Sequence, residues 1–526
     1  MEAESKCFAF IFPLASGHIN PSLPLARALV RMGHEVHYLS FEQMRESIQD
    51  TGASFHAATE YERDLYSGRE PDAAGALGSL QKEYGLEKDS WWIAYQKVKD
   101  VQLELQLPGA MNFLQEFKPS VVIYCPVANR EAPIAADLLG IPSVSLLTFA
   151  GPGARLAAQQ AMLKASGLTL TEADQQVGQF EPRGAAMERL SVKYGLHLDA
   201  DLSRSFGFMD TIKSSSFSIV TTSEKLQDPM PSELEQRYSL DGCRFVYVGP
   251  LLDEAGSVRA GVHKQSGTVS ATAEMHGEAV IQAAKQARLL GRPIVLVSMG
   301  TVITGDLKGL GWAARPVGPD GRPRGVTGRE LCQAAWGGVF DAFGSASTVA
   351  EDPVPLILMA VGPQPEPLGS LEVPANALCI PSLPQVELLK IGVDVFLTHG
   401  GQNSLMEALA HDTPLVVCPG FGDQTVNASK AVDLGVGLKV DRPDPDAGNE
   451  LPEISAYRRQ VCQSLLKVLE GHSSFKAAAE FHAEDLRSAG GVLRAVEMLL
   501  AVSDTASTNK MSDVSTRLPA CAAGGA

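Results

Sequence analysis

Residues 384–437 read PQVELLKIGVDVFLTHGGQNSLMEALAHDTPLVVCPGFGDQTVNASKAVDLGVG, and this stretch decides the fold. The apolar run VDVFLT ends before His399, two glycines follow, and apolar residues then recur at helical spacing from about Asn403. A second apolar run, PLVVCP, and a second helical segment come next. This order of strand, helix, strand and helix predicts a parallel sheet with helices packed on its faces.

The junction between the first run and its helix predicts an anion site. Gly400 and Gly401 have no Cβ atoms, so a phosphate group could approach the backbone closely and face the N–H groups and positive dipole end of the helix. An alternative stays open, because Ser404 and Glu407 form the pattern S-x-x-E, a capping box that any helix can carry. The local pattern alone favours the cap.

Farther along the same stretch, Asp423 and Gln424 lie in a glycine-flanked loop before another helix. Their polar groups could bind the hydroxyls of a sugar. A turn or N-cap role for Asp423 is an equally good interpretation of the local sequence.

The first half of the chain also alternates strand and helix. The run KCFAFIFP predicts a strand, ASGHINPS a loop, and EVHYLS the next strand, with a helix between them. Asn20 is a good N-cap for that helix and Pro21 suits its first position. His18 is therefore expected just past the C-terminal end of a strand. The pattern repeats in SVVIYCP, APIAADLLG and IPSVSLL, so a second parallel sheet is expected.

The chain is expected to divide into two α/β domains. Residues 1–250 form the first and 276–480 the second, with a polar linker at 251–275, a helix at 481–502 and a disordered tail at 503–526. Residues 61–115 and 151–235 are helical in tendency and are expected to cover a cleft. Residues 303–328, rich in Gly, Pro and Arg, predict a surface loop.

Composition excludes several classes of protein. The 526 residues are 45% hydrophobic and 20% charged, which fits a folded protein with one or two large cores. With 44 basic and 61 acidic residues, the net charge of −17 disfavours nucleic acid as a partner. Eight scattered cysteines with no metal-ligand spacing favour a reduced, cytoplasmic compartment. No transmembrane segment is expected, and peripheral contact with a membrane stays open.

Taken together, residues 384–437 closely resemble the signature of the UDP-sugar-dependent glycosyltransferases of the GT-B type, a family that includes macrolide, plant secondary-metabolite and drug-conjugating glucosyl- and glucuronosyltransferases. The segment GHINPSLPLARALVRMGHEV, from Gly17, resembles the acceptor side of the same family, and YVGPLL and SMGT resemble its strand-end motifs. The resemblance implies two facing Rossmann-like domains with a cleft between them, a nucleotide-sugar on the second domain and a small-molecule acceptor on the first.

The resemblance also implies roles for individual residues. His399, Gly401, Asn403 and Ser404 would meet the diphosphate, Glu407 the ribose hydroxyls and Gln385 the uracil, while Asp423 and Gln424 would hold the transferred sugar and Thr301, in SMGT, would complete the UDP-sugar site. His18 would act as general base in one inverting displacement. No cofactor or metal is implied, because the N-terminus of the helix would stabilise the leaving UDP. UDP-glucose is the donor that the Asp423–Gln424 pair resembles.

Two positions depart from the family pattern. The aspartate that usually orients the histidine is Cys125 here, and a thiol is a poor substitute for a carboxylate. Glu131 or Asp137 could serve His18 instead, or catalysis could be weak or absent. The tryptophan that commonly stacks on uracil is Ser382.

Three alternatives therefore remain at this point. The first is a UDP-sugar sensor or scaffold without catalysis, and the second is a nucleotide-sugar epimerase of similar fold, against which the extra helical segments argue. The third is a metal-dependent transferase, for which Asp444-Pro445-Asp446 matches Asp-x-Asp on paper. A solvated turn is the better interpretation of those three residues.

Overall fold

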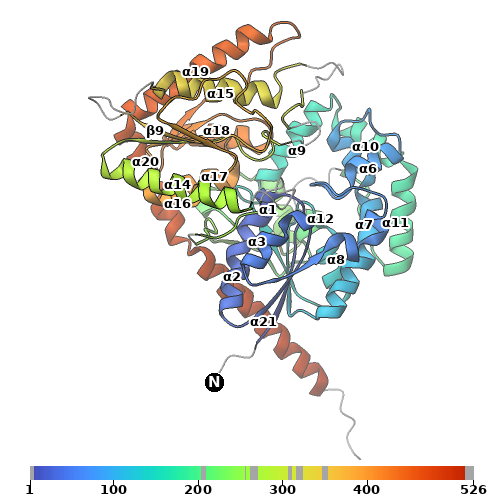
Figure 1. Cartoon of the computed structure of the whole chain (residues 1–526). Coiled ribbons are helices and arrows are strands. Elements are labelled where there is room, and N and C mark those ends of the chain that lie inside the picture. The colour runs from blue at the N-terminus through green and yellow to red at the C-terminus, as the bar shows by residue number, and fades with distance from the viewer. Residues whose placement is uncertain are drawn as a thin grey trace, which may run out of the picture.

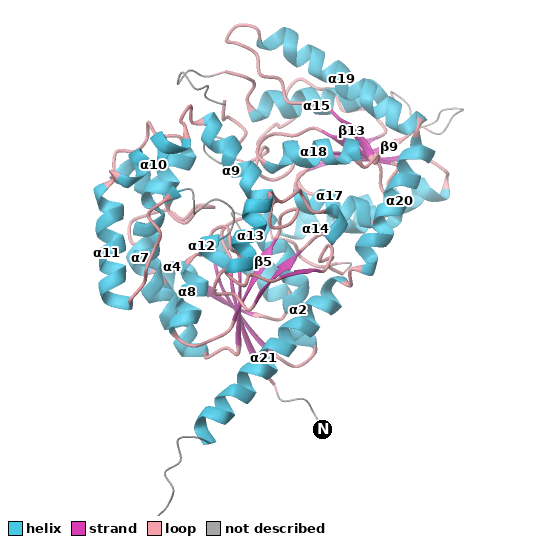
Figure 2. Ribbon diagram, turned by 180° about the vertical axis from the view of Figure 1, so that it is seen from behind, coloured by secondary structure: helices cyan, strands magenta, loops and turns pink. Residues whose placement is uncertain are grey.

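The structure is a computed structural model that describes residues 5–202, 209–254, 256–260, 270–305, 311–315, 324–345 and 354–515. Two parallel sheets, each with its own hydrophobic core, account for most of the buried residues. Helices cover both faces of each sheet (Figures 1 and 2). This is the GT-B architecture expected from the sequence.

The first sheet has seven parallel strands in the order β3-β2-β1-β4-β5-β6-β7. Its central strands CFAFI, VVIY and SVSLL are buried at every position except Cys7, as expected for a parallel sheet covered on both faces. The strands are β1 (Cys7–Ile11), β2 (Glu35–Ser40), β3 (Ser54–Ala57), β4 (Val121–Tyr124), β5 (Ser143–Leu147), β6 (Phe217–Val220) and β7 (Phe245–Tyr247).

The helices of the first domain include the segments expected to cover a cleft, and α7 is the longest of them. They are α1 (Ser16–Ile19), α2 (Leu23–Arg31), α3 (Arg45–Asp50), α4 (Ala58–Tyr61), α5 (Arg63–Tyr66), α6 (Leu77–Glu83), α7 (Trp91–Phe117), α8 (Glu131–Leu138), α9 (Ala154–Ala165), α10 (Leu170–Gly178), α11 (Glu181–Tyr194), α12 (Met209–Ile212) and α13 (Ser232–Leu240). In Figure 1, α6, α7, α10 and α11 form a layer at the side of this domain, and α9 lies toward the second domain.

The second sheet has six parallel strands in the order β10-β9-β8-β11-β12-β13. They are β8 (Ile294–Ser298), β9 (Leu356–Ala360), β10 (Ala377–Ile380), β11 (Val395–Thr398), β12 (Leu415–Val417) and β13 (Gly437–Lys439). The helices are α14 (Ser270–Leu289), α15 (Gly328–Phe343), α16 (Gln385–Ile391), α17 (Gln402–Ala410), α18 (Asp423–Asp433), α19 (Glu450–Glu470), α20 (His472–Ser488) and α21 (Gly491–Ser515).

Helix α21 returns to the first domain. The Gly491 amide donates to the Val248 carbonyl, and Lys6 pairs with Asp504 near the middle of the helix. Figure 1 shows α21 leaving the second domain and running past α2. The helix continues to Ser515, which corrects the expectation of a disordered tail from residue 503; residues 516–526 lie outside the described chain.

Other boundaries also differ from the expectation. Helix α14 begins at Ser270, inside the predicted linker, and within the linker only residues 251–254 and 256–260 precede it in the described chain. Much of the predicted loop at 303–328 lies outside the described residues, and α15 starts at its end, where Thr327 and Glu330 form a capping box. Among the described residues, no helix has the length and apolar character needed to cross a membrane.

Candidate active site

The C-terminal ends of two central strands bring the predicted residues together. Helix α1 follows β1 and carries His18, while α17 follows β11 and carries Asn403. The Ser16 hydroxyl lies 3.0 Å from the Thr301 hydroxyl of the second domain, and the Asn403 amide donates to the Gly17 carbonyl at 2.8 Å. The segment expected to hold the base therefore touches the segment expected to hold the donor, as the adjacent α1 and α17 in Figure 1 show.

The predicted helix start at Asn20 is wrong. His18 lies in the short helix α1 rather than in a loop, and a 3₁₀ turn over Asn20–Ser22 leads into α2 at Leu23. The Asn20 side chain caps no helix. It forms two hydrogen bonds with the main chain of Ala260 instead, donating at 3.2 Å and accepting at 2.8 Å.

His18 is half-buried, and its Nδ1 atom has two uncharged neighbours. The Thr148 hydroxyl lies 3.2 Å from Nδ1 and the Cys125 thiol lies 3.4 Å away. The Phe149 ring faces the imidazole with 5.8 Å between ring centroids. In the tautomer with its proton on Nδ1, the ring donates to Thr148 and keeps Nε2 free to accept a proton.

Burial and a nearby positive charge disfavour the protonated form of His18. Loss of contact with water, reinforced by the positive charge of Arg155, lowers the pKa of His18 to about 4. Burial raises the pKa of the Cys125 thiol to about 11, so that group is neutral at pH 7. The imidazole is therefore a neutral base with no carboxylate on its Nδ1 side among the described residues.

Neither acid suggested by the sequence occupies the place of the missing aspartate. The Glu131 carboxylate is fully buried and accepts a hydrogen bond from the Asn129 amide at 2.9 Å. Burial raises the pKa of Glu131 to about 7, and the pKa of its neighbour Glu62 also lies well above its usual value because of burial and the charge of Glu131. Asp137 is exposed near the end of α8.

The N-terminus of α17 has no side-chain cap. Gly401 is its N-cap residue and the helix begins at Gln402, so Ser404 and Glu407 already lie inside the first two turns. The capping-box interpretation of Ser404 and Glu407 is therefore wrong. Uncapped N–H groups at this end of the helix leave donors that can bind an anion.

His399 is fixed by two glycines. A Cβ atom on Gly300 or on Gly401 would lie 2.5 Å from the Nε2 atom of His399, so only glycine fits on either side of the ring. Burial lowers the pKa of His399 to about 4, and its Nδ1 atom has no hydrogen-bond partner among the described residues. A neutral ring held in this way can donate to or accept from a ligand at the helix end.

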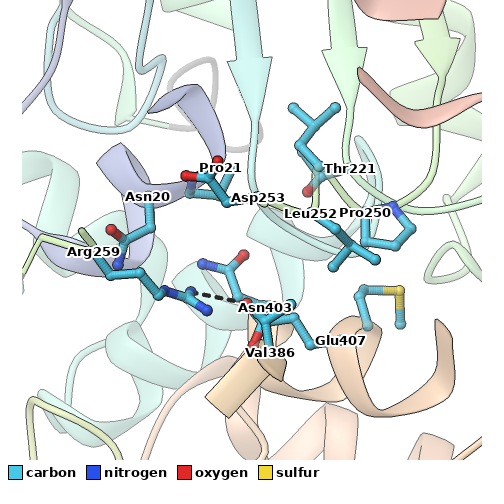
Figure 3. A pocket seen from close by; sticks show the side chains of 12 residues that line it. Asn20, Pro21, Thr221, Pro250, Leu252, Asp253, Arg259, Val386, Asn403 and Glu407 are labelled. Atoms are coloured by element: carbon cyan, nitrogen blue, oxygen red, sulfur yellow. Dashed lines mark hydrogen bonds and ion pairs between the residues drawn. The ribbon is translucent and has the colours of Figure 1, made fainter. Parts of the chain in front are cut away.

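The predicted nucleotide residues form one connected group. The Gln385 amide donates to Glu407 at 2.6 Å and to the Ser404 hydroxyl at 3.2 Å. The second carboxylate oxygen of Glu407 accepts from the guanidinium of Arg259 at 2.8 Å. Figure 3 shows Arg259 and Glu407 across a cavity whose walls come from both domains, with Asn403 and Val386 beside Glu407 and with Asn20 near Arg259.

The two residues predicted to hold the sugar lie at the start of α18. Burial raises the pKa of the Asp423 carboxyl to about 6. The Gln424 carbonyl accepts hydrogen bonds from the Gly420 and Phe421 amides, which leaves its NH₂ group as the polar end that could bind a ligand. Ser382, in the place of the stacking tryptophan, is exposed.

Three residues near these groups were not singled out from the sequence. Thr148 contacts the imidazole, Arg259 contacts Glu407, and the side-chain amide of Gln402 is buried with neither polar atom bonded among the described residues. Thr148 follows a predicted strand, which is a usable signal. Nothing local in the sequence marks Arg259 or Gln402.

The residues with metal-ligand chemistry lie elsewhere. Cys7, Glu35 and His37 come within 4.8 Å of one another at the N-terminal ends of β1 and β2, the opposite ends from His18. Asp444 forms an ion pair with Arg324, and the Pro445 carbonyl accepts from the Gly325 amide, so these two residues serve to hold a loop.

Comparison with known proteins shows which families the chain is similar to. The profile of the UDP-glucoronosyl and UDP-glucosyl transferase family matches residues 343–444. The chain is 23% identical over 485 residues to the NDP-glycosyltransferase YjiC of Bacillus subtilis (strain 168), covering 90% of this chain and 96% of that protein. It is 44% identical to human UDP-glucuronosyltransferase 3A2 over 69 residues, 12% of this chain and 13% of that one.

The crystal structure of the glycotransferase of kitacinnamycin superposes with a TM-score of 0.59 at 19% identity, covering 95% of this chain and 99% of that one. The two parallel sheets of the chain therefore share the GT-B fold of that glycosyltransferase structure. The profile over residues 343–444 and the relatives above show that the chain is similar to UDP-glycosyltransferases.

Proposed function

We propose that the protein transfers glucose from UDP-glucose to a hydroxyl group of a small lipophilic acceptor, with inversion at the anomeric carbon and with His18 as general base. One observation carries this proposal. A neutral imidazole at the end of β1 lies beside the uncapped N-terminus of α17, and the two segments are joined by the hydrogen bond from Asn403 to Gly17.

The proposed reaction has one step. The acceptor oxygen attacks the anomeric carbon while the bond from that carbon to the β-phosphate oxygen breaks, and UDP leaves with the electron pair. The proton of the acceptor hydroxyl passes to Nε2 of His18. The Thr148 hydroxyl accepts a hydrogen bond from the protonated Nδ1 of His18 and so fixes the orientation of the ring.

The donor would be held by the second domain. The N–H groups at the start of α17, with His399 and Asn403, would bind the diphosphate and stabilise the negative charge that develops on it. Glu407 would accept the two ribose hydroxyls, Gln385 would lie beside the uracil, and Asp423 with Gln424 would hold the sugar. Support comes from the hydrogen bonds of Gln385 to Ser404 and Glu407 and from the cavity that Asn403 and Glu407 line. His399, Asp423 and Gln424 do not line that cavity, and their roles rest on the family resemblance.

The test is release of UDP that depends on an acceptor. UDP-glucose and dTDP-glucose are each incubated with the protein and a panel of phenols, primary alcohols and macrolides. The dTDP-sugar is included because Ser382 stands where a tryptophan would stack on the nucleobase, so the choice between uracil and thymine is open to test. We expect UDP release with at least one acceptor and little release without any. Release from dTDP-glucose alone would overturn the choice of donor.

A second candidate function is a UDP-sugar sensor without catalysis. The observation in its favour is the uncharged pair Cys125 and Thr148 on Nδ1, where a carboxylate would strengthen the base. Tight binding of UDP-glucose with no acceptor-dependent release across the panel would favour this sensor. An epimerase fits less well, because it would not need the helical layer of α6, α7, α10 and α11.

A further inference from the structure

We propose that Arg259, which lies in the linker between the two domains, binds the diphosphate of the UDP-sugar. In the free protein its guanidinium pairs with Glu407, and it moves to the diphosphate when the ribose hydroxyls bind to Glu407. This inference rests on the proposed donor site and adds to it a residue outside both domains. No local sequence pattern assigns a ligand to this position.

The first step in the argument is that both oxygens of Glu407 already have partners. Arg259 holds Oε1 at 2.8 Å and Gln385 holds Oε2 at 2.6 Å. A carboxylate that is to accept two ribose hydroxyls must release at least one of these donors. Gln385 is also held by a hydrogen bond to the Ser404 hydroxyl, whereas the Arg259 side chain is 33% exposed, so the arginine is the partner with room to leave.

The second step concerns the backbone around Arg259, which is fixed on both sides. The Val258 amide donates to the Asp50 carboxylate at 3.0 Å. The Ala260 main chain forms its two hydrogen bonds with Asn20, two residues after His18. A guanidinium on a long side chain can therefore change partners without movement of the main chain. Figure 3 shows Arg259 in the wall of the cavity that Asn403 and Glu407 also line.

The third step is the chemistry of the new partner. Asn403 and Glu407 line the cavity with Arg259, and Asn403 lies at the start of α17, where the diphosphate is expected. Among the described residues that line the cavity, Arg259 is the one cation, and Asp253 and Glu407 are the acids. A guanidinium binds phosphate oxygens through two parallel hydrogen bonds, so the diphosphate offers it a partner at least as strong as the carboxylate that it leaves.

The test compares a nucleotide, UDP, with its nucleoside, uridine, which lacks only the diphosphate. Dissociation constants of UDP and uridine are measured by calorimetry for the wild type, R259Q and R259K. The matched control is R31Q, which loses the same charge from the exposed ion pair of Arg31 with Glu254 in the same linker. Melting curves confirm that each variant is folded.

For R259Q we expect UDP affinity to fall at least tenfold, with uridine affinity unchanged or increased, because uridine no longer has to displace the arginine. R259K should fall between the wild type and R259Q, since a lysine keeps the charge and loses the bidentate geometry. R31Q should leave both affinities within twofold of the wild type.

Two results for R259Q would overturn the proposal. Equal weakening of UDP and uridine would mean that Arg259 only ties the domains together. Tighter binding of both would mean that it only blocks the pocket. If the wild-type protein binds neither UDP nor uridine, the proposed UDP-sugar site is wrong. This result differs from the two above, in which the site exists but the role given to Arg259 is wrong.

Discussion

Replacing Cys125 by aspartate should turn His18 into a stronger base. The Cys125 thiol lies 3.4 Å from Nδ1 of His18, and the burial that lowers the pKa of His18 to about 4 is not balanced by any negative charge at that position. A carboxylate within hydrogen-bond distance raises the pKa of a histidine by about 1–3 units. With a Brønsted coefficient of about 0.5, the barrier should fall by roughly 0.7–2 kcal/mol, which is about 3–30-fold in rate.

The assay is acceptor-dependent UDP release as a function of pH, with a primary alcohol as acceptor because its hydroxyl does not ionise in the range studied. The base must be deprotonated to act, so the rate rises with pH through the pKa of the imidazolium. For the wild type that rise lies near pH 4 and the rate is flat from about pH 5 upward. For C125D the rise should move to between about pH 5 and pH 7.

The matched control is C125N, which has the shape of aspartate without its charge. We expect C125N to leave the pH profile near that of the wild type. A C125D enzyme that is folded by its melting curve but has an unchanged pH profile, or a severe loss of rate, would refute the reasoning. So would an equal effect of C125D and C125N, because the charge would then play no part.

Three further predictions follow from the same residues. H18A should lower turnover of an alcohol acceptor at least about tenfold while UDP affinity changes less than twofold, since the base acts in the transition state; unchanged turnover would remove His18 from the mechanism. E407Q should weaken uridine binding about tenfold or more, because an amide has one acceptor oxygen where the carboxylate has two; calorimetry showing equal affinity would place the ribose elsewhere. E131Q should raise the free energy of unfolding by roughly 1–3 kcal/mol at pH 8 and much less at pH 5. Burial raises the pKa of Glu131 to about 7, so the folded protein loses stability as the pH rises above the pKa of a carboxyl in the unfolded chain, and glutamine removes this loss. Denaturant unfolding at the two pH values tests this, and an equal change at both would contradict it.

The order of strands and helices around the site could be predicted from sequence because its signals are local. The apolar run ending before His399, the two glycines and the following amphipathic segment correspond to β11, its turn and α17. Likewise, His18 follows β1 closely, as the pattern predicted. Strong hydrophobic periodicity and glycine at a strand-to-helix junction are reliable over such short distances.

Local signals misled where a side chain serves a distant partner. Asn20 has the residue type of an N-cap, but its amide binds the main chain of Ala260, which lies 240 residues away. Ser404 and Glu407 have capping-box spacing, but Gly401 starts the helix early enough to place both inside it. Their side chains face Gln385 and, for Glu407, also Arg259, contacts that only the folded chain creates.

Arg259 could not have been found by the same reasoning. Its segment has the polar composition of a linker, and no periodic pattern or motif surrounds it. Its contact with Glu407 joins residues 148 positions apart, and only the folded chain creates it. Thr148 is an intermediate case, since its place after β5 was predictable and its contact with His18 was not.

The stereochemistry of the product tests the central claim most directly. The protein is incubated with UDP-α-glucose and an acceptor that it uses, and the configuration at the anomeric carbon of the product is read by proton NMR. Direct attack by an acceptor oxygen deprotonated by His18 predicts the β-glucoside in the wild type and its loss in H18A. An α-glucoside, or a β-glucoside formed equally fast by H18A, would contradict it.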